Sequence, residues 1–334
     1  MTYQSGDDGS SSSENLSKNS VECLTPVQLK RSSQQEICLG PEGDVSHCED
    51  NADKLITRTL SAAGFRLFTS SAGYFGNSRV RIGYNKRGRE VIVKRSVNQM
   101  ELEILLSASE QSDDAHFPKL LSHLSITDVR LLVLERVPTN LNQLTNQMRP
   151  PRVLNADWLR CLLRGVCSAL DFLHTERVAH RAVCLEHVLM CSRGALLCGL
   201  SQAVRCPSRS LRLPPTANVC ARQLLHWAPE MLDATRQSYD PLLADMYSLG
   251  VLLYRLLLGC NPHLSTTDPS TAHKLKFGVQ FCVNKWRIDH QALNIVKMLM
   301  CPRATFRPSA AQLKYHSWTQ TVVPVRSLLR PRSS

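Results

Sequence analysis

The order of the predicted secondary structure constrains the fold of this 334-residue chain more than any other feature. Short β-favouring runs separated by turn formers come first, and long amphipathic helices follow after Pro138. One short amphipathic helix, Gln99–Ser109, interrupts the β-rich part. The predicted strands of this part are Gly64–Phe68, Val80–Tyr84, Glu90–Lys94 and Arg130–Leu134. This order predicts an α+β protein with a small antiparallel sheet first and a larger helical part second.

The part after Pro138 is predicted to be mainly helical. Apolar residues recur at helical spacing after Asp157, which we expect to cap a helix that runs to His174. A second strong helical pattern covers Leu242–Leu258. The smaller predicted elements are the strands Val188–Met190 and Ala195–Cys198 and the helices Ala292–Met300 and Ala310–Tyr315. The chain shows no internal repeat.

The two ends of the chain differ from its middle in composition. Residues 1–54 are rich in serine and acidic residues and lack a sustained apolar period, which predicts a disordered tail. They hold four Lys or Arg and ten Asp or Glu, a charge of −6, and because the whole chain carries +12 the remainder carries +18. Residues 321–334 are predicted to be a basic C-terminal tail. Between the tails we expect a sheet part at 55–137 and a helical part at 138–320.

Composition excludes several classes of function. The chain starts without a basic stretch and an apolar core, and it has no run of about 18 apolar residues, so neither a secretory signal nor a membrane span is expected. The 13 cysteines include no C-x-x-C pair, which argues against a disulfide framework and a zinc site. No zinc finger or lysine-rich block accompanies the positive charge. We therefore expect a cytoplasmic and nuclear protein with no nucleic acid partner, no membrane partner and no metal.

Five short motifs follow one another in an order that is typical of one family. Val91–Lys94 lies on a predicted strand, as V-A-I-K does in kinases, and His180–Ala182 follows a long helix, as H-R-D does. The other three are Ala228–Glu230 for A-P-E, Asp245–Gly250 for D-x-W-S-x-G and Arg307–Ser309 for R-P-S. Over about residues 58–318 the chain resembles the protein kinase fold. The resemblance implies a two-lobed α+β architecture with a small β-rich N-lobe and a larger helical C-lobe.

The chain departs from the kinase pattern at the positions that carry catalysis. Phosphoryl transfer uses a carboxylate near the substrate hydroxyl and ligands that hold magnesium on the phosphates. Ala182 stands at the catalytic aspartate position and His187 at the metal-binding asparagine position. Leu197–Gly199, read as D-F-G, puts Leu197 at the second metal ligand. These replacements predict a catalytically degenerate domain, a pseudokinase that is not an enzyme and holds no metal.

Part of a nucleotide site remains. Gly73 and Val80 keep the first glycine and the valine of G-x-G-x-x-G-x-V, but the other two glycines are replaced, and side chains there obstruct the approach of backbone N–H groups to phosphates. Lys94 is expected to pair with Glu103 or Glu101 on the next helix. The candidate ATP-binding residues are therefore Lys94, Gly73, Val80 and Glu103, with no cofactor required for folding.

The residues that match the kinase architecture are expected to have structural roles. Glu230 and Arg307 are the expected partners of a buried ion pair that ties the segment after the activation loop to the C-lobe. Asp245 is expected to accept backbone N–H bonds from the loop that carries His180 and Arg181.

In its detailed sequence motifs the chain resembles the STE20-related adaptor (STRAD) family. That family carries H-R-S-V-x-x-x-H-I-L-I at the catalytic loop, and this chain reads HRAVCLEHVLM from His180 to Met190. G-L follows the degenerate D-F-G position in both, here as Gly199-Leu200. Two further segments are similar to the sequences of that family, Tyr239–Gly250 and Arg307–Trp318.

The resemblance implies a kinase activator without its own chemistry. STRAD members dock as pseudosubstrates on a liver-kinase-B-type serine/threonine kinase and favour its active state, a population shift. A helical-repeat scaffold protein completes the heterotrimer. Some members hold ATP without magnesium as a structural ligand.

Two alternatives stay open. A Tribbles-type pseudokinase, which brings substrates to a ubiquitin ligase, is similar locally at Thr267–Ser270, at Gln280–Cys282 and at Val323-Pro324. A weak kinase that uses a displaced acid such as Glu186 is the second alternative. Magnesium-dependent phosphorylation that is lost in Lys94→Ala is the observation that favours this enzyme.

Overall fold

The structure is a computed structural model of the chain. The predicted N-terminal tail up to residue 45 and the predicted C-terminal tail, 321–334, lie outside the described residues. So do the three segments that are similar to Tribbles. The structure describes residues 46–68, 80–96, 98–110, 116–126, 129–147, 156–212, 225–233, 236–262 and 289–320.

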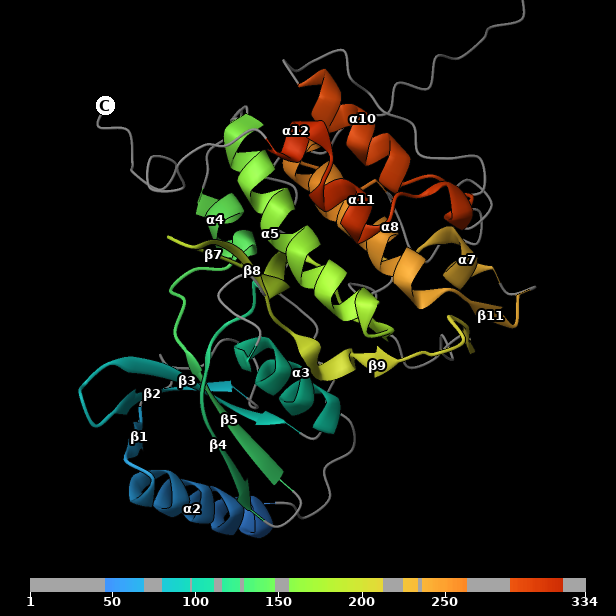
Figure 1. The fold of residues 1–334 in the computed structure, drawn as a ribbon. Helices are drawn as coiled ribbons and strands as arrows, with labels where there is room; N and C mark the ends of the chain where they lie inside the picture. Colours follow the sequence, from blue (N-terminus) through green and yellow to red (C-terminus); the bar gives the residue numbers. More distant parts are fainter. Residues whose placement is uncertain are drawn as a thin grey trace, which may run out of the picture. The chain divides into compact units, whose positions relative to one another are not determined.

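The predicted two-lobed protein kinase fold is confirmed (Figure 1). The N-lobe holds a five-stranded antiparallel sheet in the order β1-β2-β3-β5-β4. Its strands are β1 (Phe65–Leu67), β2 (Val80–Asn85), β3 (Glu90–Ser96), β4 (Leu120–Ile126) and β5 (Val129–Glu135). Four of them were predicted with ends that differ by one or two residues, and β4 was missed. As the edge strand, β4 alternates between half-buried and exposed residues, and its sequence LLSHLSI therefore lacks a clear apolar pattern.

Each face of the N-lobe sheet is covered by one helix. On one face, Val91 and Val93 of β3 pack with Ile56 and Leu60 of α2 (Ser46–Ala62). On the other face, β5 packs against α3 (Gln99–Glu110), which matches the predicted helix Gln99–Ser109. Successive residues of a strand point to opposite faces, so alternate side chains of β5 pack toward α2 and toward α3. Because α2 begins at Ser46, the predicted tail boundary at residue 54 is wrong and falls inside a helix.

The C-lobe is built around two long helices, α5 (Ala156–Thr175) and α8 (Pro241–Leu258). Asp157 does not precede α5 as the predicted cap; it lies in the first turn and pairs with Arg160 at 2.6 Å. Asp240 caps α8 by accepting from two backbone N–H groups. The other C-lobe helices are α4 (Leu141–Gln147), α7 (Pro229–Leu232), α10 (His290–Leu299), α11 (Ala310–Lys314) and α12 (Ser317–Gln320).

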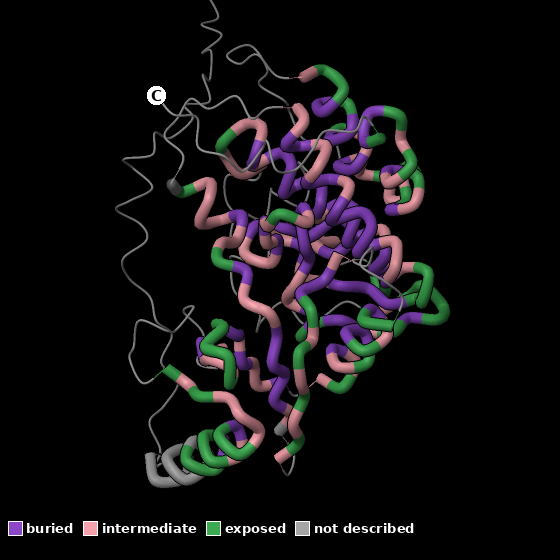
Figure 2. The backbone as a smooth tube through the Cα atoms, turned by 60° about the vertical axis from the view of Figure 1, so that its left-hand side comes forward, coloured by how far each residue is buried: buried purple, intermediate pink, exposed green. Residues whose placement is uncertain are grey.

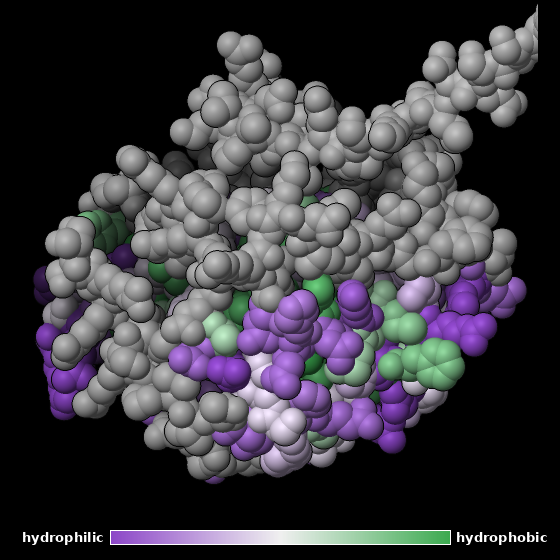
Figure 3. All heavy atoms as spheres, turned by 90° about the horizontal axis from the view of Figure 1, so that it is seen from above, coloured by the Kyte–Doolittle hydropathy of each residue, from purple (hydrophilic) through white to green (hydrophobic). Residues whose placement is uncertain are grey.

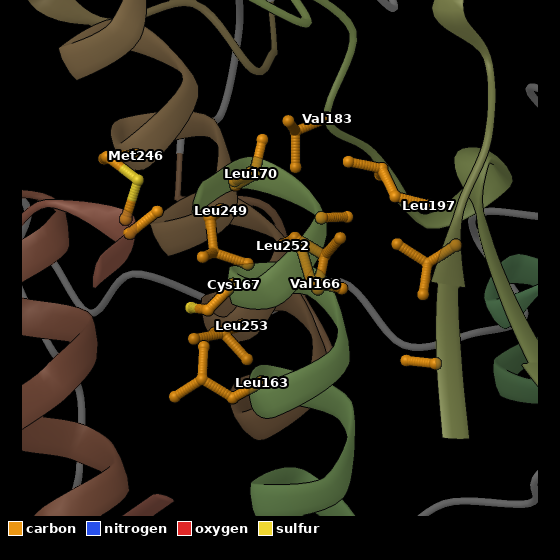
Figure 4. Packing of buried hydrophobic residues seen from close by; sticks show 14 of the residues in the cluster. Leu163, Val166, Cys167, Leu170, Val183, Leu197, Met246, Leu249, Leu252 and Leu253 are labelled. Atoms are coloured by element: carbon orange, nitrogen blue, oxygen red, sulfur yellow. The ribbon is translucent and has the colours of Figure 1, made fainter. Parts of the chain in front are cut away.

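The main hydrophobic core lies between α5, α8 and the hairpin β7–β8 (Figure 4). Leu163, Val166 and Leu170 of α5 meet Leu249 and Leu252 of α8 (Figure 4). This cluster continues into the N-lobe through α3 and β5, and Figure 2 shows the buried residues running through the interior of the molecule. Of the helices that the structure describes, α8 alone is long and apolar enough to cross a membrane, and most of it is buried in this core.

Several short strands and 3-10 turns complete the C-lobe residues that the structure describes. The hairpin β7 (Val188–Cys191) and β8 (Gly194–Leu197) lies on α5. Gly165 of α5 allows this contact, because a Cβ there would lie 2.3 Å from the Ala195 carbonyl oxygen. The remaining pieces are β6 (Val178–Ala179) with β9 (Val204–Arg205), β10 (Leu211–Arg212) with β11 (Ser238–Tyr239), and the 3-10 turns η3 (Leu185–His187), η4 (Leu200–Gln202) and η6 (Ala304–Phe306).

Candidate functional site

Lys94 of β3 forms an ion pair with Glu101 in the first turn of α3. Lys94 Nζ lies 2.5 Å from Glu101 Oε1, and the Glu101 side chain is only 3% exposed. Ser96 Oγ donates to the other carboxylate oxygen of Glu101 at 2.8 Å. The sequence predicted Glu103 or Glu101 as the partner; Glu103 is exposed on the outer face of α3 and does not take this role. The pair fixes α3 against the sheet.

A second set of contacts joins α3 to the segment after β8. Lys94 Nζ donates to Ser201 Oγ at 2.9 Å. Asn98, just before α3, donates to the carbonyl oxygens of Ser201 and Ala203, both at 3.1 Å. The side-chain oxygen Oδ1 of Asn98 accepts from the Met100 N–H at 3.0 Å. We call these contacts of Lys94 and Asn98 with residues 201–203 the α3 latch, because they tie a helix of the N-lobe to a loop of the C-lobe.

Asp245 holds the loop that carries His180 and Arg181. Its carboxylate accepts from the backbone N–H groups of both residues at 2.7 Å and lies 3.1 Å from His174 Nε2. The two backbone hydrogen bonds are the contacts that the sequence predicted for Asp245. His180 Nε2 lies 2.9 Å from the Cys198 carbonyl oxygen, and its Nδ1 accepts from the Ala182 N–H. Burial lowers the pKa of His180 to about 4, so the ring is neutral and Nε2 donates.

The structure corrects the register of the D-F-G segment. Leu197 is buried at the end of β8 opposite Val188, so its side chain belongs to the core and not to the site. The backbone turns at Gly199, whose φ of +84° is left-handed, and η4 begins at Leu200. Gly199–Ser201 therefore occupies the D-F-G position. The predicted motif began two residues too early, because Leu197 and Cys198 were assigned both to the strand Ala195–Cys198 and to the loop that follows it.

His187 fills the space in front of Gly199. A Cβ at residue 199 would lie 2.5 Å from Cγ of the His187 ring. The ring is held by its Nδ1, which donates to the Ala182 carbonyl oxygen at 2.7 Å, and burial lowers its pKa. Ala182, His187 and Gly199 thus bring a methyl group, a neutral imidazole and no side chain to the three positions that bind substrate and metal in kinases.

These residues do not fit a magnesium ion. The ion prefers carboxylate and other oxygen ligands, and the three positions supply none. Among the residues that the structure describes, no group of three or more His, Cys, Asp or Glu side chains is placed to hold a metal. For a nucleotide, Lys94 supplies a cation, and Val80 lies opposite Lys94 in the β2–β3 ladder. Gly73 lies outside the described residues.

Glu186, the displaced acid of the weak-kinase alternative, lies in η3 between the catalytic-loop positions Ala182 and His187. Burial raises the pKa of Glu186, but a hydrogen bond from its own backbone N–H, one from Cys184 and the charges of Arg255 and His226 together lower it. C-lobe residues near α8 thus help to stabilise the charged form of the Glu186 carboxylate.

Glu230 and Arg307 form the predicted buried ion pair. Both guanidinium Nη atoms donate to the carboxylate, at 2.6 and 2.7 Å. The side chains are 4% and 0% exposed. Arg307 also donates to the carbonyl oxygens of Cys301 and Leu243 and lies over the Tyr247 ring. The pair ties α7 to η6 and α8.

Sequence reasoning missed three residues of the site: Asn98, Gly199 and Ser201. Asn98 carried a usable signal, because asparagine immediately before an apolar-periodic run favours a helix N-terminus. Gly199 and Ser201 were hidden by the wrong register. No local pattern indicates that Ser201 contacts Lys94, since 107 positions separate the two residues.

Comparisons with known proteins point to protein kinases, as the fold does. A family model described as the protein kinase domain matches residues 84–319. "Putative CBL-interacting protein kinase 27" of Oryza sativa subsp. japonica is 27% identical over 263 residues, 76% of this chain and 63% of that protein. Serine/threonine-protein kinase SRK2A of Arabidopsis thaliana is 26% identical over 166 residues, 48% and 45% of the two chains. Serine/threonine-protein kinase SAPK3 of Oryza sativa subsp. indica is 22% identical over 263 residues, 74% of each.

These relatives correct one prediction. The sequence predicted that the chain is not an enzyme, but the three relatives are all named as protein kinases, which points to catalytic activity and contradicts it. The prediction relied on residue identities at Ala182, His187 and Leu197, and the last was read in the wrong register. None of the three relatives is a STE20-related adaptor. The chain spans 63% and 45% of the first two relatives, less than two thirds of each.

Proposed function

This chain belongs to the protein kinase family, and we propose that it binds and allosterically activates a liver-kinase-B-type serine/threonine kinase, together with a helical-repeat scaffold protein. The observation that carries the proposal is the α3 latch. It holds α3 and the segment after β8 together through Lys94 and Asn98.

The latch supports docking for a thermodynamic reason. A surface that is already ordered in the free protein loses less conformational entropy when a partner binds. The segment after β8 is held by the latch at residues 201–203 and by the β6–β9 and β10–β11 pairs further along. A partner kinase that binds this segment better in its active state shifts toward that state by the difference between the two binding free energies.

The test is co-expression with a liver-kinase-B-type kinase, with and without the scaffold, followed by co-purification and a partner activity assay. Asn98→Ala removes two hydrogen bonds of the latch, worth about 2 kcal/mol together, so the ordered arrangement should become roughly 30-fold less favoured. We expect a clear loss of partner activation. Gln202→Ala is the matched control, because Gln202 is an exposed neighbour on η4 and should leave activation unchanged.

The outcomes separate the proposal from its alternatives. A complex with raised partner activity supports it, and a selective loss in Asn98→Ala locates the effect at the latch. No complex in the presence of the scaffold contradicts it. Co-purification of a ubiquitin ligase in place of the kinase would move the chain to the Tribbles-like alternative.

ATP without magnesium is the proposed structural ligand, and it rests on Lys94 as the phosphate contact. The residues at the magnesium positions do not fit the ion, so ATP should raise the melting temperature equally in EDTA and in magnesium. Lys94→Met should abolish the shift. An unchanged melting temperature with ATP in both buffers contradicts this part of the proposal.

Protein phosphorylation by the chain itself is a second candidate function. The names of the relatives favour it, and so does the Lys94–Glu101 pair, which orders α3 in the same way as the Lys–Glu pair of kinases. Purified chain, free of partner kinase, is incubated with labelled ATP, magnesium and a serine/threonine peptide. Phosphorylation that is lost in Lys94→Met supports the activity, and phosphorylation that survives in this variant is assigned to a contaminating kinase.

A further inference from the structure

Four exposed arginines lie together beside the loop that Asp245 holds. We define the arginine face as Arg177, Arg205, Arg209 and Arg212, all of which are exposed. Arg177 precedes β6, Arg205 lies in β9, Arg209 follows in the next turn and Arg212 lies in β10. Arg205, Arg209 and Arg212 belong to the segment that follows the α3 latch.

Backbone pairing and hydrogen bonds join three of the four arginines. Val178, next to Arg177, is the Cα partner of Arg205. The Cys206 N–H donates to the Arg177 carbonyl oxygen at 2.8 Å, and the Arg209 N–H donates to the Cys206 carbonyl oxygen at 3.0 Å. Three of the four arginines therefore belong to one hydrogen-bonded unit, and Arg212 follows in the strand that pairs with β11.

Two of these arginines have a backbone conformation that arginine rarely adopts. Arg177 has a φ of +55° and Arg209 a φ of +54°. The left-handed region is easiest for glycine and asparagine and is strained for a long side chain. Strained residues of this kind cluster at functional sites. The two left-handed positions therefore favour a functional role for this segment.

The acidic side chains nearby do not neutralise the face. Glu176 lies 4.0 Å from Arg205, and both side chains are about half exposed, so water screens this pair. Asp240 accepts from Arg209, but it is also the cap of α8. Among the described residues, no carboxylate lies within ion-pair distance of Arg177 or Arg212. At least two guanidinium groups are therefore available to a partner.

We propose that the arginine face binds an acidic, carboxylate-rich segment of a partner protein. The fork of N–H groups on arginine matches a carboxylate, and the bond of Arg209 to Asp240 already shows this recognition on the face. A nucleic acid is the less favoured partner, because among the described residues the aromatic side chain next to these arginines in the β10–β11 pair, Tyr239, is buried and cannot stack on bases. Figure 3 shows the molecule from above, where the described side chains are mostly hydrophilic with separate hydrophobic ones between them.

This inference rests on the proposed function only for the identity of the partner, and it is tested without that partner. Fluorescence anisotropy follows the binding of a short labelled peptide of alternating glutamate and glycine to the full chain. Arg205→Glu combined with Arg212→Glu should weaken binding about tenfold or more, since each reversal replaces an attraction by a repulsion. Arg58→Glu combined with Arg89→Glu is the control, since both residues are exposed on the N-lobe and the change in net charge is equal.

Each outcome of the binding experiment either supports or overturns the inference. Selective weakening by the first pair, together with a fall in affinity as salt rises, supports the inference. Equal weakening by both pairs, or by neither, overturns it, because net charge alone or another surface then explains the result. A single-stranded oligonucleotide that binds more tightly than the peptide and depends on the same arginines also overturns the assignment to a protein partner. Partner activation that persists when the peptide does not bind rejects this inference and leaves the proposed function standing.

Discussion

Replacing Glu230 by glutamine should destabilise the protein more than a substitution at any exposed ion pair. The change keeps the shape of the side chain but removes its charge, so the guanidinium of Arg307 stays buried with 0% of its side chain exposed and without its counter-ion. Burying a charge without a partner is one of the most costly changes in a protein core. The affected contacts are the two charge-assisted hydrogen bonds at 2.6 and 2.7 Å.

The magnitude follows from these contacts. A hydrogen bond to a charged group contributes roughly 1.5–3 kcal/mol, so two of them give about 3–6 kcal/mol. The loss of one partner of a buried pair costs about 3–5 kcal/mol in other proteins, which agrees. For a domain of this size, 1 kcal/mol corresponds to roughly 2–4 °C in melting temperature, so Glu230→Gln should lower it by about 6–20 °C.

Urea unfolding measures the free energy directly, with circular dichroism and tryptophan fluorescence as two independent signals, because Trp158, Trp227 and Trp318 are all buried. The matched control is Glu176→Gln, which breaks the exposed pair with Arg205 and should change the free energy of unfolding by less than about 0.5 kcal/mol.

The double variant Glu230→Met with Arg307→Met completes the cycle. It leaves no buried charge, but carbonyl oxygens such as that of Cys301 lose their donor, so it should lose only about 2–3 kcal/mol, less than the sum of the single variants. A Glu230→Gln variant within about 0.5 kcal/mol of the original protein would refute the reasoning.

Three further predictions concern the centre of the molecule. Burial lowers the pKa of His180 from 6.5 to about 4, so the unfolded chain takes up the proton at a higher pH than the folded protein. The free energy of unfolding should therefore fall by ~2 kcal/mol as the pH is lowered from about 7.5 to about 5, measured by urea titrations, and His180→Phe should flatten this dependence. Gly199→Ala should destabilise the protein by roughly 1–3 kcal/mol because its Cβ meets the His187 ring, and a smaller loss in a His187→Ala background, measured by the same titrations, checks this cause. Burial raises the pKa of Cys184 and of Cys198 to about 12, so mass spectrometry should find both unalkylated by iodoacetamide at mildly alkaline pH until urea unfolds the chain.

Prediction from the sequence succeeded where a pattern is local and repeated. The long helices around Leu170 and Leu252 show their apolar faces at helical spacing, and both are present. It failed where burial comes from a distant element. The edge strand β4 has a weak alternation, and α2 begins among residues whose composition is that of a tail. Its buried residues Ile56 and Leu60 gain their partners from β3 and β5, which lie far along the chain.

The sequence by itself determined the family, the order of the two lobes and the residues at two catalytic positions, Ala182 and His187. It also determined the pairing of Glu230 with Arg307 and of Asp245 with the loop of His180, because these residues occur in ordered motifs. The tertiary structure decided which glutamate meets Lys94, which residues stand at the D-F-G position and how Ser201 reaches the same lysine. Those choices depend on where β8 ends and on how closely α3 approaches the following loop. Such distances are set by packing between segments about a hundred residues apart, and no local spacing in the sequence encodes them.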